Sequence, residues 1–457
     1  MMNPLRPLVA SLKSVLPLVL CAGLLLMQAT SLAAAPTLTG IAHFNGSNGR
    51  ESRSDLVLGP DGLLYGTTRL GGVFSTGAVF KVTTGGTITL LSSLTGSSGS
   101  EPQGSVAFGP DGQLYGTAYG GGVAGYGTVW RVPTNGAGVV LASFEGTNGA
   151  YPLGGLTLAA DGNFYGTTFT GADSGYFGMV FKLTAGGSLT KLPFGSITNA
   201  SATGRFPYAP LAQASGGFYG TTYQGGSSGL GTIFRIATSG GSMSTVVSFT
   251  GTNGSGPQTG LTTGTDGSLY GVTRLGGGAN LGTVFKKAAG PSTTVTTLAS
   301  FLNATTDGAE PGAALVQGTD GNFYGTTSRG GSTDDGTVFR ISPAGGLTRL
   351  ASFSYSSSGY LPLGKMVFGP DGNLYGTTAY GGSSGNGTVY RVSGLDLTIV
   401  TQPVSTNVLA GANVSMAVTA FGSGPVTYQW RFNGTNIGGA TSNSLVLANV
   451  RDRKSVV

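Results

Sequence analysis

Cysteine, histidine and charge are scarce in this chain. Its 457 residues include one cysteine, Cys21, and one histidine, His43, and only 9% of them are charged. A single cysteine excludes an internal disulfide, and a single histidine excludes a zinc site with several histidine ligands. The formal net charge of +6 is spread along the chain without a basic run, so no nucleic-acid partner is expected.

The first 33 residues have the pattern of a secretion signal. Arg6 and Lys13 supply positive charge, residues 15–27 are apolar, and residues 31–33 read Ser-Leu-Ala. The apolar run is too short to cross a membrane as a helix, so no transmembrane segment is expected. We expect residues 1–33 to be a signal peptide and the protein to be secreted or held at the cell surface, with any C-terminal anchor missing.

Glycine, by contrast, is abundant, with 85 residues, and much of it belongs to a repeat. A Tyr-Gly dipeptide follows a turn, Asp-Gly in six of the seven copies, and recurs at separations of 50 to 54 residues. A fixed period of this size indicates a propeller or a solenoid. The repeated tyrosines are Tyr65, Tyr115, Tyr165, Tyr219, Tyr270, Tyr324 and Tyr375.

Each repeat predicts four short strands, which we call A to D. Strand A precedes the turn, strand B holds Tyr-Gly-Thr-Thr, strand C reads Gly-Thr-Val-Phe followed by Lys or Arg, and strand D ends in Phe. The segments are rich in β-branched and aromatic residues, and no helical period is present. Four strands in about fifty residues are typical of a propeller blade. We therefore predict an all-β, seven-bladed propeller over residues 34–397.

The two ends of the repeat array complement each other. A strand-D sequence ending in Phe44 precedes the first strand A, whereas the seventh repeat has no strand D of its own. We expect residues 38–44 to complete the last blade and close the ring, which removes the exposed sheet edges of an open array. A closed ring of this kind is expected to be monomeric.

The repeat ends near residue 398, and the tail resembles bacterial immunoglobulin-like domains. Trp430 lies where that family places its core tryptophan, but the segments for the last two strands of the sandwich do not follow. Residues 452–457 look like a translated adapter. We expect residues 398–457 to be an incomplete immunoglobulin-like β-sandwich from a truncated reading frame.

The repeat unit as a whole is similar to the Gloeobacter/Verrucomicrobia (GloVer) tandem repeat. The unit reads Gly-x-Asp-Gly-x-[Leu/Phe]-Tyr-Gly-Thr-Thr, followed by Gly-Gly and Gly-Thr-Val-Phe-[Lys/Arg]. The fourth repeat departs from it, because Ser215 replaces the aspartate. The resemblance implies an exported protein with a C-terminal surface anchor, and it implies no enzymatic activity, cofactor or ligand.

The acidic residues do not form an obvious catalytic set. One aspartate per turn is too few for a calcium site, which needs several oxygen ligands, so we interpret the turn aspartates as caps of their own turns. His43 is expected to be packed or at the rim. The nearest acid pairs in sequence are Asp307 with Glu310 and Asp334 with Asp335; their clustering would favour a carbohydrate-active hydrolase or lyase. We predict no catalytic residue, no metal site and no cofactor.

A basic residue ends strand C in every repeat. It could present a ring of charge to an anionic polymer, but we expect each stem to pack over apolar surface with its charged end in water. These residues are Lys81, Arg131, Lys182, Arg235, Lys286, Arg340 and Arg391.

The loops point to one face of the predicted ring. The B–C and D–A loops are longer and more varied than the others, and in an up-and-down blade they fall on the same face. Their aromatic and arginine side chains suit sugar stacking or a protein partner. We predict a non-catalytic binding or scaffold module whose ligand is a polysaccharide or a cell-surface protein; the alternatives are a carbohydrate-active enzyme and a structural spacer. The candidate binding residues are Arg69, Tyr119, Tyr151, Phe169, Tyr223, Arg274, Arg329, Tyr360 and Tyr380.

Overall fold

The computed structural model describes most of the chain after residue 34. The described residues are 35–136, 138–171, 177–192, 204–214, 216–238, 243–290, 292–395, 398–401, 411–421, 428–432 and 435–449. The signal segment 1–33, the strand-D residue Phe194, the exceptional Ser215 and the adapter-like residues 452–457 lie outside them. The described chain contains only strands, and no apolar helix of membrane-spanning length occurs in it.

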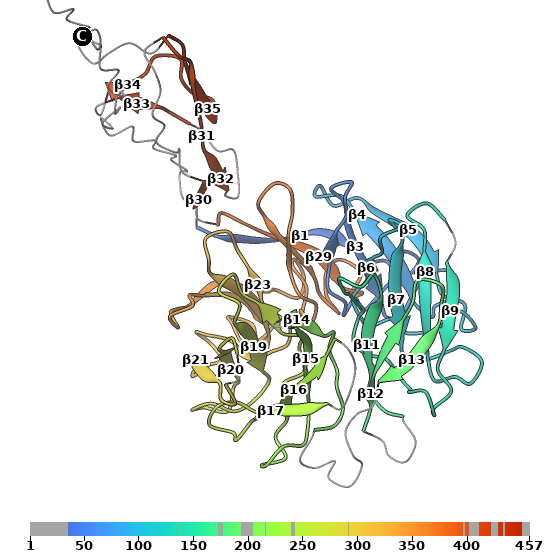
Figure 1. Ribbon diagram of the computed structural model, residues 1–457. Coiled ribbons are helices and arrows are strands. Elements are labelled where there is room, and N and C mark those ends of the chain that lie inside the picture. The colour runs from blue at the N-terminus through green and yellow to red at the C-terminus, as the bar shows by residue number, and fades with distance from the viewer. Residues whose placement is uncertain are drawn as a thin grey trace, which may run out of the picture. The chain divides into compact units, whose positions relative to one another are not determined.

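The first four repeats each form a four-stranded antiparallel blade in the order A-B-C-D (Figure 1). Blade 1 contains β2 (Val57–Leu58), β3 (Leu64–Thr68), β4 (Ala78–Val82) and β5 (Ile88–Ser93). Blade 2 contains β6 (Ala107–Phe108), β7 (Leu114–Ala118), β8 (Thr128–Val132) and β9 (Val139–Ser143). Blade 3 contains β10 (Thr157–Leu158), β11 (Phe164–Thr168), β12 (Met179–Leu183) and β13 (Leu189–Leu192). Blade 4 contains β14 (Ala212–Ala214), β15 (Gly217–Thr222), β16 (Thr232–Ala237) and β17 (Ser244–Ser248).

The last three repeats continue the same arrangement. Blade 5 contains β18 (Thr262–Thr263), β19 (Leu269–Thr273), β20 (Thr283–Lys287) and β21 (Thr296–Ser300). Blade 6 contains β23 (Val316–Gln317), β24 (Phe323–Arg329), β25 (Thr337–Ile341) and β26 (Leu347–Ser352), and an extra strand β22 (Ala309–Pro311) pairs with β24. Blade 7 contains β27 (Val367–Phe368), β28 (Leu374–Thr377), β29 (Thr388–Ser393) and, as its fourth strand, β1 (Thr37–His43). The prediction of an all-β, seven-bladed propeller is confirmed.

Strand β1 pairs antiparallel with β29, from Thr37 opposite Ser393 to His43 opposite Thr388. His43 is half-buried there, and its Nδ1 accepts the backbone N–H of Ser383 at 3.4 Å. The first strand of the ring therefore lies in the same sheet as the last repeat.

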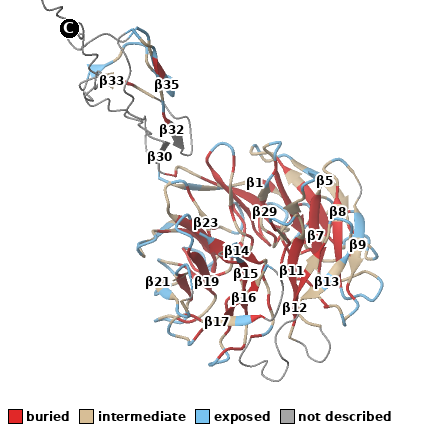
Figure 2. Ribbon diagram, in the orientation of Figure 1, coloured by how far each residue is buried: buried red, intermediate tan, exposed pale blue. Residues whose placement is uncertain are grey.

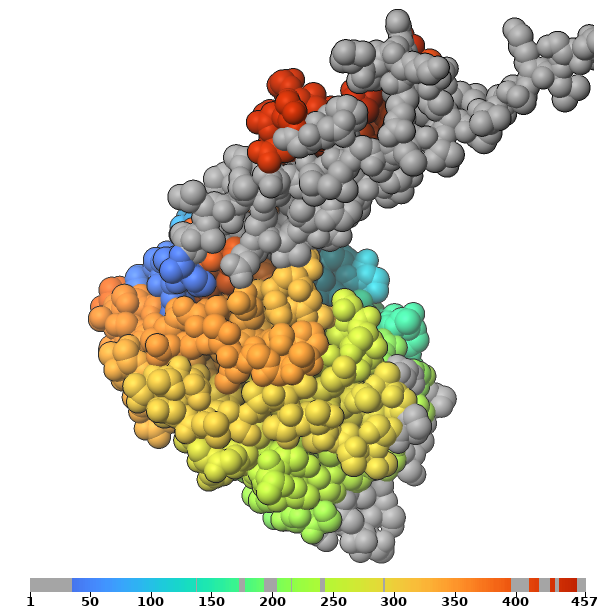
Figure 3. Space-filling model, turned by 90° about the vertical axis from the view of Figure 1, so that its left-hand side faces the viewer, coloured from blue at the N-terminus to red at the C-terminus, as the bar shows by residue number. Residues whose placement is uncertain are grey.

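The hydrophobic core lies between blades. Each blade buries its B and C strands, as Figure 2 shows, and seven clusters each combine side chains from two neighbouring blades. Phe44, for example, packs against Phe80 with ring centroids 5.1 Å apart, in a cluster that also contains Tyr375 of blade 7. On the side of the propeller that Figure 3 shows, neighbouring blades follow the order of the sequence, from green through yellow to orange. Stability therefore depends on contacts with both neighbours of every blade.

The repeated tyrosine is tied to the turn that precedes it. Its hydroxyl donates to the aspartate Oδ2, at 2.6 Å from Tyr65 to Asp61 and 2.7 Å from Tyr375 to Asp371. The other carboxylate oxygen accepts the backbone N–H two residues on, as in Leu63 N–H to Asp61 at 3.1 Å. The turn-capping interpretation of the aspartates is confirmed, and the bond to the tyrosine is an addition that sequence reasoning missed.

The basic residue of strand C lies opposite the same tyrosine and reaches the same aspartate. Lys286 pairs with Asp266 at 2.8 Å, and Lys182 pairs with Asp161 at 3.1 Å. The charged ends of Lys182 and Lys286 stay accessible to water, as expected, and they also pair with the turn carboxylate, a contact that sequence reasoning missed. In blades 2, 3 and 5 the charge of the proposed basic ring is thus paired within the blade.

Packing and hydrogen bonds explain the residue types in the Gly-Thr-Thr part of the motif. The glycine lies opposite the strand-C aromatic residue, and a Cβ on Gly116 would come within 2.3 Å of the Trp130 ring. The first threonine donates to a carbonyl of the next blade, as Thr117 does to Gly154 at 3.0 Å. The second threonine donates to the carbonyl two residues on, as Thr168 does to Thr170. The motif therefore links each blade to its own turn, its own loop and the following blade.

The turn aspartates predict a specific acid sensitivity. Partial burial alone raises the pKa of Asp266, but hydrogen bonds from Lys286, the Ser268 backbone and Tyr270 outweigh it and lower the pKa to about 2. The pKa values of Asp61 and Asp161 are lowered in the same way, despite burial, by hydrogen bonds to their carboxylates. A carboxyl whose folded pKa lies below its unfolded value of about 3.9 stabilises the fold above that pH and loses the contribution as pH falls further.

We therefore expect the melting temperature to be level from pH 7 to about 5 and to fall between about pH 4 and 2. Circular dichroism melts across this range measure it. An Asp266→Asn variant should show a smaller fall over the same interval. A melting temperature that stays level down to pH 2 would contradict the role given to these carboxylates.

Residues 34–395 form one compact unit, and the described residues after 396 belong to a second. In the second unit β30 (Thr398–Thr401) pairs with β32 (Thr419–Phe421), β31 (Val414–Ala417) with β35 (Ser444–Leu447), and β33 (Arg431–Phe432) with β34 (Thr435–Asn436). Trp430 is fully buried against Val418 and Leu445, and its indole N–H donates to the Ser442 carbonyl at 2.9 Å. This tryptophan is the centre of a small core of its own.

Candidate functional site

The B–C and D–A loops meet on one face of the ring. In most blades a residue of one loop pairs with a residue of the other through a backbone bridge, such as Arg50 with Leu70 and Tyr360 with Tyr380. The next D–A residue adopts a left-handed conformation, as in Glu51 (φ 55°) and Tyr151 (φ 58°). Because a non-glycine residue rarely adopts this conformation, its repeated use marks a fixed loop geometry rather than a loose connection.

Five of the predicted site residues occupy one equivalent position. Each lies four residues after the repeated tyrosine and donates its backbone N–H to the left-handed residue of its own blade, as Phe169 does to Tyr151. Blades 6 and 7 have Ser328 and Ala379 at this position. Arg329 and Tyr380 lie one residue further on, so their side chains start from the opposite side of the chain. The five equivalent residues are Arg69, Tyr119, Phe169, Tyr223 and Arg274.

Arg69 is held by two glutamates from different blades. Its Nε and Nη2 atoms contact Glu101 of the next blade at 2.9 and 2.8 Å, and Nη1 contacts Glu51 at 3.0 Å. These hydrogen bonds and charges raise the pKa of Arg69 although burial opposes them. Arg274 makes a similar contact with Glu310 of blade 6, through Nε at 3.0 Å and Nη2 at 2.8 Å. These two arginines connect neighbouring blades.

Between the two arginines the face is aromatic. Tyr119 stacks on Tyr151 with ring centroids 4.8 Å apart, and Tyr126 meets Tyr151 edge-on at 5.7 Å. Each aromatic contact joins a B–C loop to the D–A loop of the same or the following blade. Tyr126 was not predicted as a site residue, because it lies late in its loop where the repeats differ most.

Blades 3 and 4 add a second aromatic group. Phe169 stacks on Phe206 at 4.8 Å and contacts Tyr208 at 5.0 Å, and Tyr208 meets Tyr223 edge-on at 5.6 Å. Sequence reasoning missed Phe206 and Tyr208, since they follow a D–A segment of irregular length that has no counterpart in other repeats. All four rings are half-buried, so each keeps part of its surface open to solvent.

Side chains from three blades converge near Tyr208. Burial raises the pKa of Tyr208 first, the nearby hydroxyls of Tyr223 and Tyr119 raise it further, and the charge of Arg274 opposes them. Tyr119 belongs to blade 2, Tyr208 and Tyr223 to blade 4, and Arg274 to blade 5. We call the aromatic and arginine residues of this part of the face the loop-face cluster: Arg69, Tyr119, Tyr151, Phe169, Phe206, Tyr208, Tyr223 and Arg274.

The remaining predicted residues lie at blades 6 and 7. Arg329 is exposed and pairs with Asp334 at 3.2 Å, and Tyr360 lies parallel to Tyr380 with ring centroids 6.4 Å apart. The charge of Tyr360 contributes to the raised pKa of Arg329, for which Asp334 is the first cause. Arg329 and Tyr380 lie one residue further along their loops than the position that Tyr223 occupies in blade 4.

The acids considered as a catalytic pair are occupied by other partners. Asp307 accepts the backbone N–H groups of Leu302 and Asn303, and Asp335 accepts the Tyr355 N–H. Asp334 is engaged with Arg329, and Glu310 with Arg274. Among the described residues no group of acids, histidine or cysteine has metal-binding geometry.

One further contact joins two charged residues of blades 1 and 7. Asp55 precedes β2, and its carboxylate accepts the backbone N–H of Lys365, which precedes β27, at 2.8 Å. Burial raises the pKa of Asp55 and lowers the pKa of Lys365, although each charge partly offsets the effect on the other. This contact joins blade 1 to blade 7 and serves the ring rather than the loop face.

Comparisons with known proteins agree with this architecture. The chain resembles virginiamycin B lyase from Staphylococcus aureus (TM-score 0.51, 14% identity, 78% of this chain and 99% of that one covered). It also resembles the extracellular domain of a protein assigned as a hybrid two-component system from B. thetaiotaomicron (TM-score 0.52, 11% identity), of which it spans 45% while 86% of this chain is covered. At these identities the likeness concerns the fold alone.

At the level of sequence, no curated protein matches the chain. The model of the Gloeobacter/Verrucomicrobia repeat matches it three times, over residues 29–196, 159–317 and 290–443. These matches together cover the whole ring. The chain therefore belongs to the Gloeobacter/Verrucomicrobia repeat family.

Proposed function

We propose that this protein is a non-catalytic binding module that holds a polysaccharide on the face built by its B–C and D–A loops. The observation that carries the proposal is the loop-face cluster, in which half-buried aromatic rings from blades 2, 3 and 4 lie between Arg69 and Arg274. Flat, amphipathic rings of this kind offer stacking surface together with hydroxyl groups that form hydrogen bonds.

The side chains of the cluster are already held in place before a ligand binds. Its rings pack against one another, and its two arginines are held by carboxylates: Arg69 by Glu51 and Glu101, and Arg274 by Glu310. Less conformational entropy is lost when a ligand binds to side chains that are already ordered. The acidic residues beside the cluster, Glu51, Glu101 and Glu310, are paired with its arginines. This pairing supports a role in binding rather than in acid–base catalysis.

The same proposal covers the parts of the chain around the face. We propose that pairing of β1 with β29 closes the ring as a monomer, and that residues 398–449 belong to an immunoglobulin-like sandwich with Trp430 as its core residue. We propose further that the protein is exported and acts outside the cell or at its surface. The fold likeness to an extracellular domain is compatible with that location.

Binding of the full chain to a panel of soluble polysaccharides, with reducing ends and unsaturated products assayed in the same samples, tests the proposal. We expect binding without turnover. Tyr119→Ala and Tyr223→Ala should each weaken it roughly 10- to 30-fold, the usual effect of truncating a central aromatic contact.

Tyr355→Ala is the matched control, because Tyr355 is an exposed tyrosine of a D–A loop outside the cluster. It should bind as the unchanged chain does. Product formation that accompanies binding would sink the non-catalytic assignment. Equal weakening by all three substitutions, or no binding to any polysaccharide, would remove the loop-face cluster as a glycan site.

A further inference from the structure

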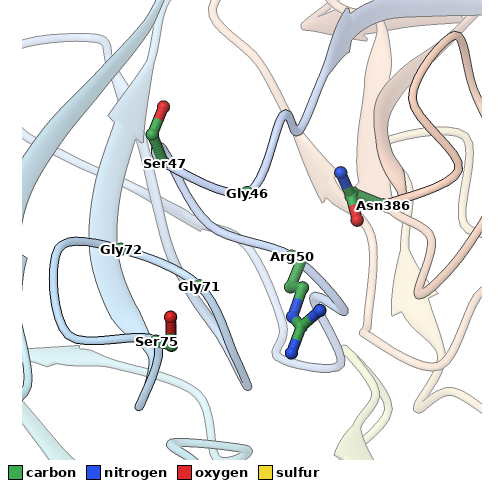
Figure 4. A pocket seen from close by; sticks show the side chains of 7 residues that line it. All are labelled: Gly46, Ser47, Arg50, Gly71, Gly72, Ser75 and Asn386. Carbon is green, nitrogen blue, oxygen red and sulfur yellow. The ribbon is translucent and has the colours of Figure 1, made fainter.

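A polar pocket lies on the loop face where blade 1 meets blade 7. It has a volume of about 370 Å³ and lies between the D–A and B–C loops of blade 1, with Asn386 contributed by a loop of blade 7. Figure 4 shows Arg50 and Asn386 across the pocket from the loop that carries Gly71, Gly72 and Ser75. Its size is within the range of pockets that hold small ligands.

Arg50 supplies the positive charge of the pocket, and its side chain is exposed to solvent. The guanidinium of Arg50 has no hydrogen bond or ion pair with any described residue, unlike Arg69, Arg274 and Arg329 on the same face. No acidic side chain lines the pocket. The side chains of Ser75 and Asn386 are also without hydrogen bonds to the described part of the chain. One cation and two polar groups thus face the same space.

The equivalent loop of blade 6 shows what this geometry accommodates. There the carboxylate of Asp334 accepts the backbone N–H of Gly330 at 2.7 Å and pairs with Arg329 at 3.2 Å. In blade 5 the side-chain oxygen of Asn280 accepts the N–H of Gly276 at 2.8 Å. In both loops a side-chain oxygen occupies the place beside the first glycine.

Blade 1 has the same loop without that oxygen. Ser75 stands where blade 6 has Asp334, with almost the same backbone conformation (φ 59° and 62°), but its shorter side chain does not accept the Gly71 N–H. The loop is held by a backbone bridge between Gly71 and Thr76. In blade 1 the guanidinium comes from Arg50 in the facing loop, whereas in blade 6 it comes from Arg329. The carboxylate that completes this arrangement in blade 6 has no counterpart among the described residues of blade 1.

We propose that this pocket binds the carboxylate of a uronic acid residue in a polysaccharide lying on the loop face. The guanidinium forms the paired hydrogen bonds that match a planar carboxylate, and the hydroxyl and amide groups bind the sugar hydroxyls. The inference rests on the proposed function, and it narrows the ligand to an acidic polysaccharide.

The test compares polygalacturonate with its methyl-esterified form, which presents the same sugar with the carboxylate blocked, by titration calorimetry on the full chain. We expect polygalacturonate to bind about tenfold more tightly or better, the effect of one charge-assisted hydrogen-bonded pair. Arg50→Gln should abolish this preference. Arg205→Gln is the matched control, because Arg205 occupies the same register in blade 4 but lies over the Phe206 ring at 5.3 Å; it should keep the preference.

Each other outcome overturns a different part of the inference. Equal affinity for the two polymers, or a preference that survives Arg50→Gln, removes the carboxylate site while glycan binding that depends on Tyr223 still stands. Equal loss in both arginine variants shows a non-specific effect of charge. Poly-glutamate that competes with the same dependence on Arg50 removes the assignment to uronate. Binding of neither polymer, nor of any neutral polysaccharide, removes the proposed function itself.

Discussion

A chain that lacks residues 35–44 should not fold into a stable ring. The deletion removes β1, which pairs with β29 along its length, and Phe44, which is fully buried between blades 7 and 1. Burial of a phenylalanine of this kind contributes about 3–5 kcal/mol, against a total stability of about 5–15 kcal/mol for a typical domain. The deletion also leaves β29 as an exposed edge, which favours aggregation.

The expected result is loss of the cooperative thermal transition seen by circular dichroism, with a chain that begins at residue 35 as the control. A synthetic peptide of residues 35–45 should restore the transition in part, because it can pair with the same edge. If the shortened chain melts within a few degrees of the control, β1 is dispensable and the blades are held together without it.

Phe285→Ala should be among the most destabilising single substitutions in the ring. Phe285 is fully buried, lies opposite Gly271 in the neighbouring strand and packs against Phe249 in a tilted arrangement with ring centroids 5.2 Å apart. The expected cost is about 3–5 kcal/mol in the free energy of unfolding, from lost burial and the cavity that remains. Urea denaturation followed by tryptophan fluorescence measures it.

Tyr390→Phe is the matched substitution, since Tyr390 holds the same position in blade 7. Its buried hydroxyl has no hydrogen-bond partner among the described residues, and most other blades have phenylalanine at this position. Removing an unsatisfied buried hydroxyl should leave stability unchanged or raise it by about 1 kcal/mol. A cost below about 1 kcal/mol for Phe285→Ala, or a large loss for Tyr390→Phe, would contradict the account of this position.

The fold was predictable because its signal is periodic. The spacing of Tyr65 and its six counterparts indicates the number of blades, and the Asp-Gly turns indicate where strands A and B meet. The hydrogen bond from the tyrosine to its turn aspartate was missed, because the aspartate was already interpreted as a cap of its turn and the tyrosine as a residue of strand B. The link from Thr117 to Gly154 was missed because it joins different repeats, and a period alone does not show which residues of neighbouring units touch.

The site was predictable only in part, for the same reason. Arg69, Tyr119, Tyr223 and Arg274 follow the repeat and were found. Their partners were not found: Tyr208 comes after an insertion, and Glu101 and Glu310, which hold the arginines, lie in the loop of the following blade. The pocket at Arg50 depends on the short side chain of Ser75 in place of the carboxylate of Asp334, which becomes visible only when the loops of blades 1 and 6 are compared in space.

Hydrogen–deuterium exchange of the full chain, with and without polygalacturonate, tests the central claim most directly. Loops lose their amide hydrogens quickly, so a ligand that lies on them slows exchange there. The account predicts protection in residues 45–51, 69–76, 119–126 and 204–208, with no change in the Asp-Gly turns on the opposite face. Protection of the Asp-Gly turns would contradict this prediction. So would bound polymer that protects neither face of the ring.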